Sequence, residues 1–176
     1  GRKTTVHLKK EINPFILMKE CQNMSDNSYH FGLSIPDQVS FVSFSPELLY
    51  SRHHQEIESV ALAGTYPRSS NIEEDIKLEK TLLENKKNIH EHNFVKEMIV
   101  DNLKEMTEWL SIGKKAVLKL PNIQHLLVTI RGKLKPNITD SNLLTQLHPT
   151  SAIGGEPKIS SLSILKKLEP FNRGWY

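Results

Sequence analysis

The chain has 176 residues, with 23 lysines and arginines against 20 aspartates and glutamates, which gives a formal net charge of +3. This length can bury one hydrophobic core, and 38% hydrophobic with 24% charged residues excludes an intrinsically disordered chain. The single cysteine, Cys21, excludes a disulfide framework and a cysteine-based zinc site, and no apolar run reaches the length of a membrane-spanning helix. No signal peptide is evident, so we expect a soluble, cytoplasmic protein.

The basic residues do not predict a nucleic-acid partner. They form short lysine pairs on segments that we expect to be solvent-exposed, whereas phosphate binding needs lysines and arginines gathered on one face. We therefore expect neither a nucleic-acid nor a membrane partner. The pairs are Lys86-Lys87, Lys114-Lys115 and Lys166-Lys167.

The N-terminal third is expected to form short antiparallel strands. Residues 4–8 alternate and are rich in β-branched side chains. Asn13 precedes a short helix over residues 14–20, with Pro14 at the tolerated first position. Turn residues at 34–38 join the second and third strands as a hairpin. The other expected strands cover residues 28–33, 39–44, 48–52 and 59–62.

The rest of the chain is expected to be mainly helical, with one further pair of strands. Ser70 and Glu73 fit a capping box for a helix that runs to about Asn85, and a longer apolar stripe predicts a helix from about His90 to Leu110. Strands followed by helices favour an α+β fold in which antiparallel sheets are flanked by helices. The remaining expected elements are strands 116–120 and 123–130, a helix 141–147 capped by Asp140, a loop at Gly154-Gly155 and a helix 161–168.

Glu91 is the most informative residue from periodicity alone. It precedes Phe94, Val95 and Met98 at helical spacing, which predicts that it projects along the apolar stripe. A carboxylate there is paired, at the rim of the core, or bound to a hard cation such as Mg2+. A favourable place in the first turn of the helix is the alternative interpretation.

Other single residues are weaker signals. His90 and His92 flank Glu91, but neighbouring helical residues do not face one another, which argues against a joint metal site. His125 lies in an apolar strand, where a histidine is more often structural than catalytic. Ala63-Gly64-Thr65 indicates a tight backbone approach, and Glu47 alone is typical of a turn carboxylate.

Six segments in register resemble chorismate-utilising enzymes. The resemblance covers nearly the whole chain and is greatest to isochorismate synthases, whose H-P-T-x-A motif carries alanine at the position of Ala152. The segments are FSPE (44–47), LAGTYPR (62–68), KNIHEHNFV (87–95), KLPNIQHL with GKL (119–126 and 132–134), LHPTSAIGGEP (147–157) and EPFNRGWY (169–176).

The resemblance implies Mg2+-dependent conversion of chorismate to isochorismate, in which water enters C2 as the C4 hydroxyl leaves. It implies a general acid at Glu47, whose pKa should be raised while it holds its proton. It also implies a histidine beside the substrate ring at His125 and a Mg2+ ligand at Glu91. The residues that it implies for substrate binding are Gly64, Thr65, Ala152, Gly154, Gly155 and Tyr176.

The match also predicts an incomplete domain, truncated at both ends. The family's water-activating lysine falls upstream of the position matched by Arg2, and further family segments follow the position of Tyr176. We therefore expect residues 1–176 to be part of one chorismate-binding domain, inactive alone and able to self-associate through exposed sheet edges.

Two alternatives stay open from the sequence. One is another chorismate enzyme, namely a salicylate, anthranilate or aminodeoxychorismate synthase. The other is a non-catalytic remnant of the fold. The sequence also leaves open whether the product supplies menaquinone, siderophore or salicylate biosynthesis.

Overall fold

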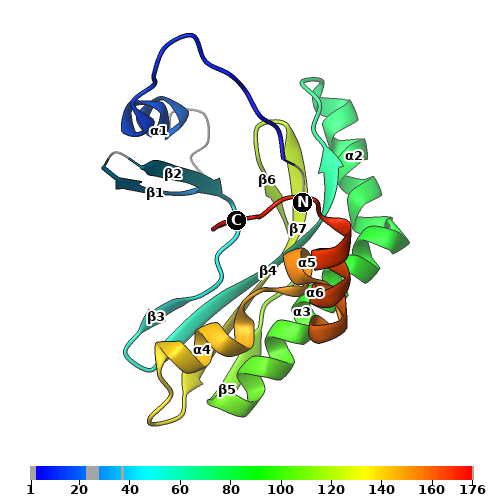
Figure 1. Ribbon diagram of the computed structural model, residues 1–176. Helices are drawn as coiled ribbons and strands as arrows, with labels where there is room; N and C mark the ends of the chain where they lie inside the picture. Colours follow the sequence, from blue (N-terminus) through cyan, green and yellow to red (C-terminus); the bar gives the residue numbers. More distant parts are fainter. Residues whose placement is uncertain (1–2, 23–27, 37, 176) are drawn as a thin grey trace. The chain divides into compact units, whose positions relative to one another are not determined.

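The structure is a computed structural model that describes residues 3–22, 28–36 and 38–175 (Figure 1). The chain divides into two compact units, of which the smaller ends at Leu48 and the larger begins at Leu49. Antiparallel sheets and helices make up both units, which confirms the α+β class expected from the sequence. The assignment of both units to one domain stays a prediction.

The smaller unit contains one helix and one hairpin. Helix α1 (Pro14–Gln22) begins after Asn13, whose Oδ1 accepts hydrogen bonds from the backbone N–H groups of Phe15 and Ile16. Strands β1 (Tyr29–Ile35) and β2 (Val39–Ser45) pair antiparallel. The predicted helix and hairpin are therefore confirmed. None of the unit's described residues is fully buried.

The predicted strand at residues 4–8 is wrong. Residues 3–8 have no regular secondary structure, and no described strand pairs with them. The side chains of Val6 and Leu8 are 71% and 59% exposed. A β-propensity pattern needs a partner strand and a surface to pack on, and neither is supplied here.

The larger unit is built on a five-stranded antiparallel sheet. Its order is β3-β4-β7-β5, and the short strand β6 also pairs with β7. The two long central strands carry most of the buried sheet residues. The strands are β3 (Ser51–His53), β4 (Glu56–Pro67), β5 (Thr107–Ile112), β6 (Ala116–Lys119) and β7 (Ile123–Leu134).

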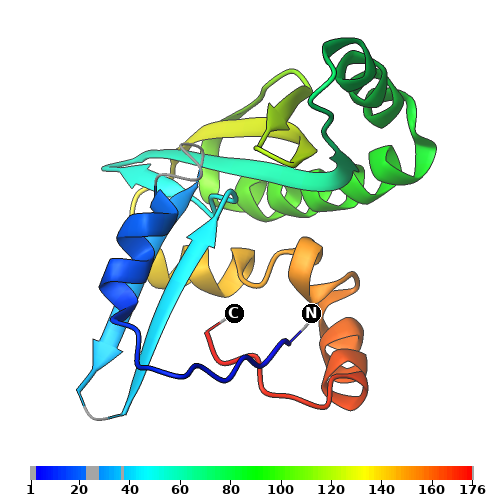
Figure 2. The same ribbon diagram turned by 90° about the horizontal axis from the view of Figure 1, so that it is seen from above.

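One face of this sheet is covered by helices (Figure 2). The long helix α3 packs against β4 and β7 and buries a stripe that includes Val95, Ile99 and Leu103. These side chains form one apolar core with Ile57, Val128 and their neighbours. The helices are α2 (Ile72–Glu84), α3 (Lys86–Met106), α4 (Asp140–Leu147), α5 (Ser151–Gly154) and α6 (Lys158–Leu168).

The bounds predicted for the long helix, His90 to Leu110, are wrong at both ends. Helix α3 begins at Lys86 and ends at Met106, and the following residues form strand β5. Thr107 is already extended, and Trp109 pairs with Lys133 of β7. The apolar pattern continues across this change from helix to strand, so periodicity alone could not locate it.

Two predicted helix caps are displaced by one residue. Asn71, not Ser70, caps α2, because its side chain accepts a hydrogen bond from the backbone N–H of Glu74. Thr139, not Asp140, caps α4 and forms a capping box with Asn142. Asn, Ser, Thr and Asp all cap helices well, so neighbouring candidates are hard to separate from sequence.

Two helices near the C-terminus also differ from the expectation. The short helix α5 was not predicted, and α6 begins at Lys158, three residues before the predicted start. No helix in the described part of the chain is both long and apolar enough to cross a lipid bilayer.

Candidate active site

The centre of the candidate site is a hydrogen-bonded pair on two neighbouring strands. Thr65 of β4 lies opposite His125 of β7, and Thr65 Oγ1 is 3.0 Å from His125 Nδ1. On β7 the neighbours Gln124 and Leu126 are fully buried on the helix-covered face, so His125 projects from the opposite face. The structure thus brings together two residues that the sequence placed 60 positions apart.

A β-bulge at Gly64 produces this pairing. Ala63 pairs with Leu126 and Thr65 pairs with His125, so Gly64 is the extra residue on β4. Side chains alternate along a strand, and one inserted residue therefore reverses which face each later side chain occupies. Without the bulge, Thr65 would project toward the helices instead of lying beside His125.

Gly64 is suited to this position for two reasons. Its φ angle is +74°, a conformation that L side chains rarely adopt. A Cβ atom there would also lie 3.0 Å from the backbone oxygen of Asn88, in the first turn of α3. The predicted tight backbone approach at Ala63-Gly64-Thr65 is confirmed, although β4 continues beyond it to Pro67.

The environment of His125 favours a neutral imidazole. Burial lowers the pKa of His125 below its ordinary value, and a hydrogen bond with the backbone of Gly64 opposes this with a smaller effect. A neutral ring can accept a proton at one nitrogen and donate from the other. Beside a reacting group, such a ring can therefore position or transfer a proton near pH 7.

Glu91 does not occupy the buried stripe of α3, which corrects the expectation from periodicity. Its side chain is 50% exposed, and its Oε1 lies 3.7 Å from Lys87 Nζ in an exposed ion pair. The buried position is the next residue, His92, which is fully buried. Phe94, a member of the predicted stripe, is itself 45% exposed, whereas Val95 and Ile99 of that stripe are buried. Glu91 therefore lies beside the buried stripe, one residue before its member His92.

Glu91 nevertheless lies on one flank of α3 rather than on its far side. Met98 and Asn102, seven and eleven residues further on, share this flank and are partly buried. Asn102 Nδ2 donates a hydrogen bond to the backbone oxygen of Gln146, at the end of α4. The Glu91 carboxylate is therefore solvent-accessible and lies beside the buried stripe of α3. Its role as a metal ligand stays a prediction.

His90 and His92 form no joint metal site, in agreement with the argument from their spacing. The ring of His90 packs edge-on against Phe94 at 4.5 Å, whereas His92 is buried. Burial lowers the pKa of His92, and its two ring nitrogens have no hydrogen-bond partner of good geometry among the described residues. Across the described ranges, no three histidine, cysteine or acidic side chains gather as a metal site.

Glu47 belongs to the smaller unit. It follows β2, and its backbone N–H donates a hydrogen bond to Ser45 Oγ at 3.2 Å. Its side chain is partly buried. Tyr176, also predicted for the site, lies outside the described residues. Their roles as general acid and substrate ligand stay predictions.

Ala152, Gly154 and Gly155 line a pocket of about 410 Å³ formed by α5, its C-cap and α6. Gly155 has a φ angle of +77°, and a Cβ atom there would lie 2.8 Å from the Cβ atom of Ser161. The loop predicted at Gly154-Gly155 begins only at Gly155, because Gly154 is the last residue of α5. Ala152 is exposed at this pocket, so a larger side chain there would narrow it.

Arg173 also lines this pocket. It donates two 2.6 Å hydrogen bonds to the carboxylate of Glu169 and one to the backbone oxygen of Ile153. The guanidinium group lowers the pKa of Glu169 to about 2. Arg173 therefore fixes the C-terminal segment against α5, where Ala152 lies.

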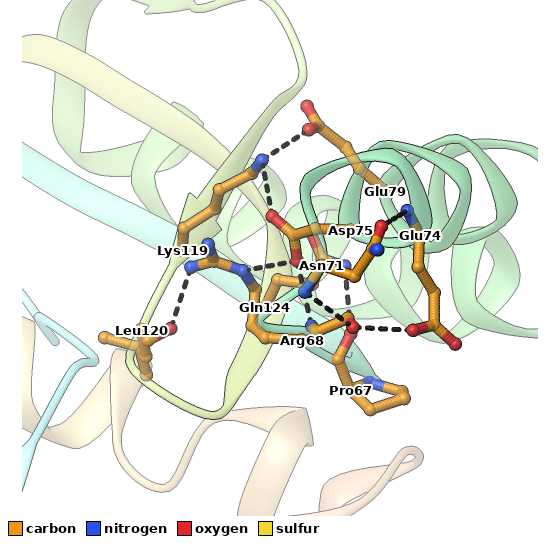
Figure 3. Close-up of polar contacts among 10 residues, drawn as sticks. Pro67, Arg68, Asn71, Glu74, Asp75, Glu79, Lys119, Leu120 and Gln124 are labelled. Carbon is orange, nitrogen blue, oxygen red and sulfur yellow. Dashed lines mark hydrogen bonds and ion pairs between the residues drawn. The ribbon is translucent and has the colours of Figure 1, made fainter.

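A buried charge cluster near His125 was not predicted as a site (Figure 3). The carboxylate of Asp75 on α2 lies 2.7 Å from Arg68 Nε and 3.3 Å from Lys119 Nζ. Lys119 also contacts Glu79 at 2.7 Å. Arg68 and Lys119 belong to two of the motifs that carry the family resemblance, and no local pattern in the sequence relates them to Asp75.

Comparison with known proteins identifies the relatives of this chain. The sequence profile of a family described as "Chorismate binding enzyme" matches residues 1–176. The chain is 34% identical over 176 residues to isochorismate synthase MenF of Haemophilus influenzae, and 32% identical over 177 residues to the chloroplastic isochorismate synthase 2 of Arabidopsis thaliana. It spans 41% and 32% of the length of these proteins.

Solved structures agree with this similarity. The menaquinone-specific isochorismate synthase MenF of Escherichia coli superposes with a TM-score of 0.83 at 30% identity, over 89% of this chain and 36% of that one. Anthranilate synthase component I of Streptococcus pneumoniae superposes over 92% of this chain and 35% of that one, with a TM-score of 0.79 at 22% identity. The latter likeness concerns the fold alone.

Proposed function

Because the chain belongs to the family of chorismate-binding enzymes, we propose that it supplies part of the active site of an isochorismate synthase. The substrate is chorismate, and the product is isochorismate. The observation that carries the proposal is the Thr65–His125 pair, presented by the Gly64 bulge in a chain 34% identical to a protein of that name.

The proposed reaction moves a hydroxyl group round the ring of chorismate. Water adds at C2 and gives one proton to a general base, the ring double bonds shift, and the C4 hydroxyl takes one proton from a general acid and leaves as water, so the substrate and product have the same composition. Glu47 takes the role of the acid that protonates the departing hydroxyl, and the imidazole of His125 takes the role of the group beside the ring. Thr65 fixes the orientation of that imidazole through its hydrogen bond to Nδ1.

Mg2+ is part of the same proposal. Mg2+ keeps several waters and binds proteins through one or two carboxylates together with substrate groups. The carboxylate of Glu91, which is 50% exposed and lies in an exposed ion pair with Lys87, fits the role of one such ligand. When bound, the ion would supply positive charge to the carboxylate of the substrate.

Product specificity is proposed to depend on the pocket lined by Ala152. The small side chain leaves room beside Gly154 and Gly155, whereas related lyases carry a larger residue at the matching position in the motif resemblance. The cytoplasmic location and self-association through sheet edges stay predictions of the sequence.

The test is product analysis of the full-length gene product that carries this sequence. Incubation with chorismate and Mg2+ should form isochorismate, and His125→Asn should reduce its rate by roughly 10²-fold or more. His53→Asn, which changes an exposed histidine of β3, is the matched control and should leave the rate unchanged. Formation of anthranilate, aminodeoxychorismate or salicylate in place of isochorismate would contradict the proposal.

A further inference from the structure

Asp75 is held by two cations at the edge of the sheet. Its side chain is 10% exposed, Arg68 Nε donates to Oδ1 at 2.7 Å, and Lys119 Nζ donates to Oδ2 at 3.3 Å (Figure 3). The backbone N–H of Ser69 also donates to Oδ1. These contacts keep the pKa of Asp75 well below its ordinary value, with the hydrogen bond from Arg68 as the largest cause.

The same residues tie the turn between β6 and β7 to the end of β4. Arg68 Nη1 donates a hydrogen bond to the backbone oxygen of Leu120 at 3.0 Å. The backbone N–H of Arg68 donates to the backbone oxygen of Asn122, also at 3.0 Å. The fully buried Gln124 donates from Nε2 to the backbone oxygen of Pro67 at 3.0 Å. We call Arg68, Asp75, Lys119 and Gln124 the Asp75 network.

The Asp75 network lies one rung away from His125. Gln124 pairs with Tyr66 on one side and with Lys119 on the other. His125 occupies the next rung, between Thr65 and Leu118. Successive side chains alternate between faces, so the network supports from the helix-covered face the strand segment that presents His125 on the opposite face.

This arrangement bears on the Thr65–His125 hydrogen bond. The bond joins two strands and depends on the register that follows the Gly64 bulge. Bulges locally disrupt strand pairing, so the short segment after one needs other contacts to hold its register. Strand β4 ends at Pro67, only two residues beyond Thr65, so few ladder hydrogen bonds follow the bulge. The hydrogen bonds of Arg68 and Gln124 supply further contacts from this end of β4 to the turn between β6 and β7 and to β7 itself.

We propose that the Asp75 network is a positioning device that holds the imidazole of His125 against Thr65 in its reactive orientation. Asp75 is the central member, since its carboxylate contacts both Arg68, directly after β4, and Lys119 on β6. The importance of that orientation for catalysis rests on the proposed function, whereas the positioning itself does not.

The test is nitrogen NMR of the protein with 15N-labelled histidine. Thr65→Val, which removes the hydroxyl, defines the Nδ1 shift of His125 without its hydrogen bond. Asp75→Asn should move the His125 Nδ1 resonance in the same direction. Lys119→Met, which leaves the Arg68 contact, should cause a smaller shift. The matched control is Glu73→Gln, which removes an exposed first-turn carboxylate of the same helix outside the network.

The free energy of unfolding is measured on the same samples. It distinguishes a displaced His125 ring from a general loss of stability. A folded Asp75→Asn or Lys119→Met protein with an unchanged His125 Nδ1 resonance overturns the proposal. If Asp75→Asn does not fold, the Lys119→Met spectrum decides. If the resonance shifts as expected while the full-length gene product forms no isochorismate, the positioning stands and only the proposed function fails.

Discussion

Thr65 Oγ1 lies 3.0 Å from Nδ1 of His125 across the β4–β7 ladder, and the Gly64 bulge places both side chains on the same face of the sheet. A threonine hydroxyl fixes the plane of the ring, and half-burial keeps the ring neutral. The chemistry assigned to His125 therefore depends on the backbone geometry of Gly64, three residues before the end of β4 at Pro67.

Replacing Gly64 by alanine should destabilise the protein by about 2–4 kcal/mol, because the positive φ angle and the contact with Asn88 both oppose a Cβ atom. Gly174→Ala is the control, since Gly174 has a φ angle of +64° but open space around its Cβ position, and should cost about 1 kcal/mol. Urea unfolding measures both. Equal losses would show that the approach of α3 to Gly64 is unimportant.

The free energy of unfolding should fall as the pH drops below about 6.5, the ordinary histidine value. Burial lowers the pKa of His92 and His125 in the folded protein, so the unfolded chain binds more protons in this range. This contribution is fully present above the ordinary value and is lost as the pH falls toward the folded pKa.

His92→Leu tests the contribution of His92, the fully buried histidine, to this pH dependence. Leucine has a similar volume and cannot titrate, so the variant should lose less stability between pH 7.5 and pH 5.5 than the parent. The groups around His92 are the cations Lys96 and Lys115, which lower its pKa further, and the backbone of Ala61, which opposes them. His90→Leu, at an exposed position of the same helix, is the matched control for replacing a helical histidine by leucine. An unaltered pH profile for His92→Leu would contradict this prediction.

Glu91→Gln should abolish Mg2+-dependent chorismate binding and change stability by less than about 0.5 kcal/mol, because its ion pair with Lys87 is exposed. Calorimetry with chorismate, with and without Mg2+, measures the first effect, and thermal unfolding measures the second. Glu97→Gln removes another exposed carboxylate of α3 and should alter neither. Retained Mg2+ dependence in Glu91→Gln would remove Glu91 from the proposed metal site.

Ala152→Thr should narrow the pocket on α5 and divert some product toward a lyase outcome. The measurement is chromatography of the products that the full-length gene product forms from chorismate. Ala152→Gly, which enlarges the pocket, should keep isochorismate as the product. An unchanged product distribution in Ala152→Thr would show that this position does not control specificity.

Local patterns predicted most elements because each depends on contacts close in sequence. The hairpin of β1 and β2 followed from its turn residues. The strands predicted at residues 59–62 and 123–130 cover only part of β4 and β7, whose pairing joins residues far apart in sequence. The end of α3 did not, because an apolar helix stripe passes directly into the apolar strand β5. The strand predicted at residues 4–8 failed for want of a partner among the described strands.

The candidate site shows the same division. Motif resemblance named Thr65 and His125 separately, but their contact depends on a register shift at Gly64 that only the fold shows. Asp75 and Lys119 are 44 residues apart, so nothing local relates them. Glu91 was assigned to the buried stripe because Phe94 and Val95 are both apolar, and only packing showed that Val95 and His92 face the core.

The most direct test of the central claim is a chorismate titration followed through the imidazole resonances of His125. With Mg2+ present, the account predicts a saturable shift of the His125 ring nitrogens, weakened in Glu91→Gln, and no shift of the exposed His53. Saturable chorismate binding that leaves the His125 resonances unmoved would contradict the claim that the Thr65–His125 pair faces the substrate.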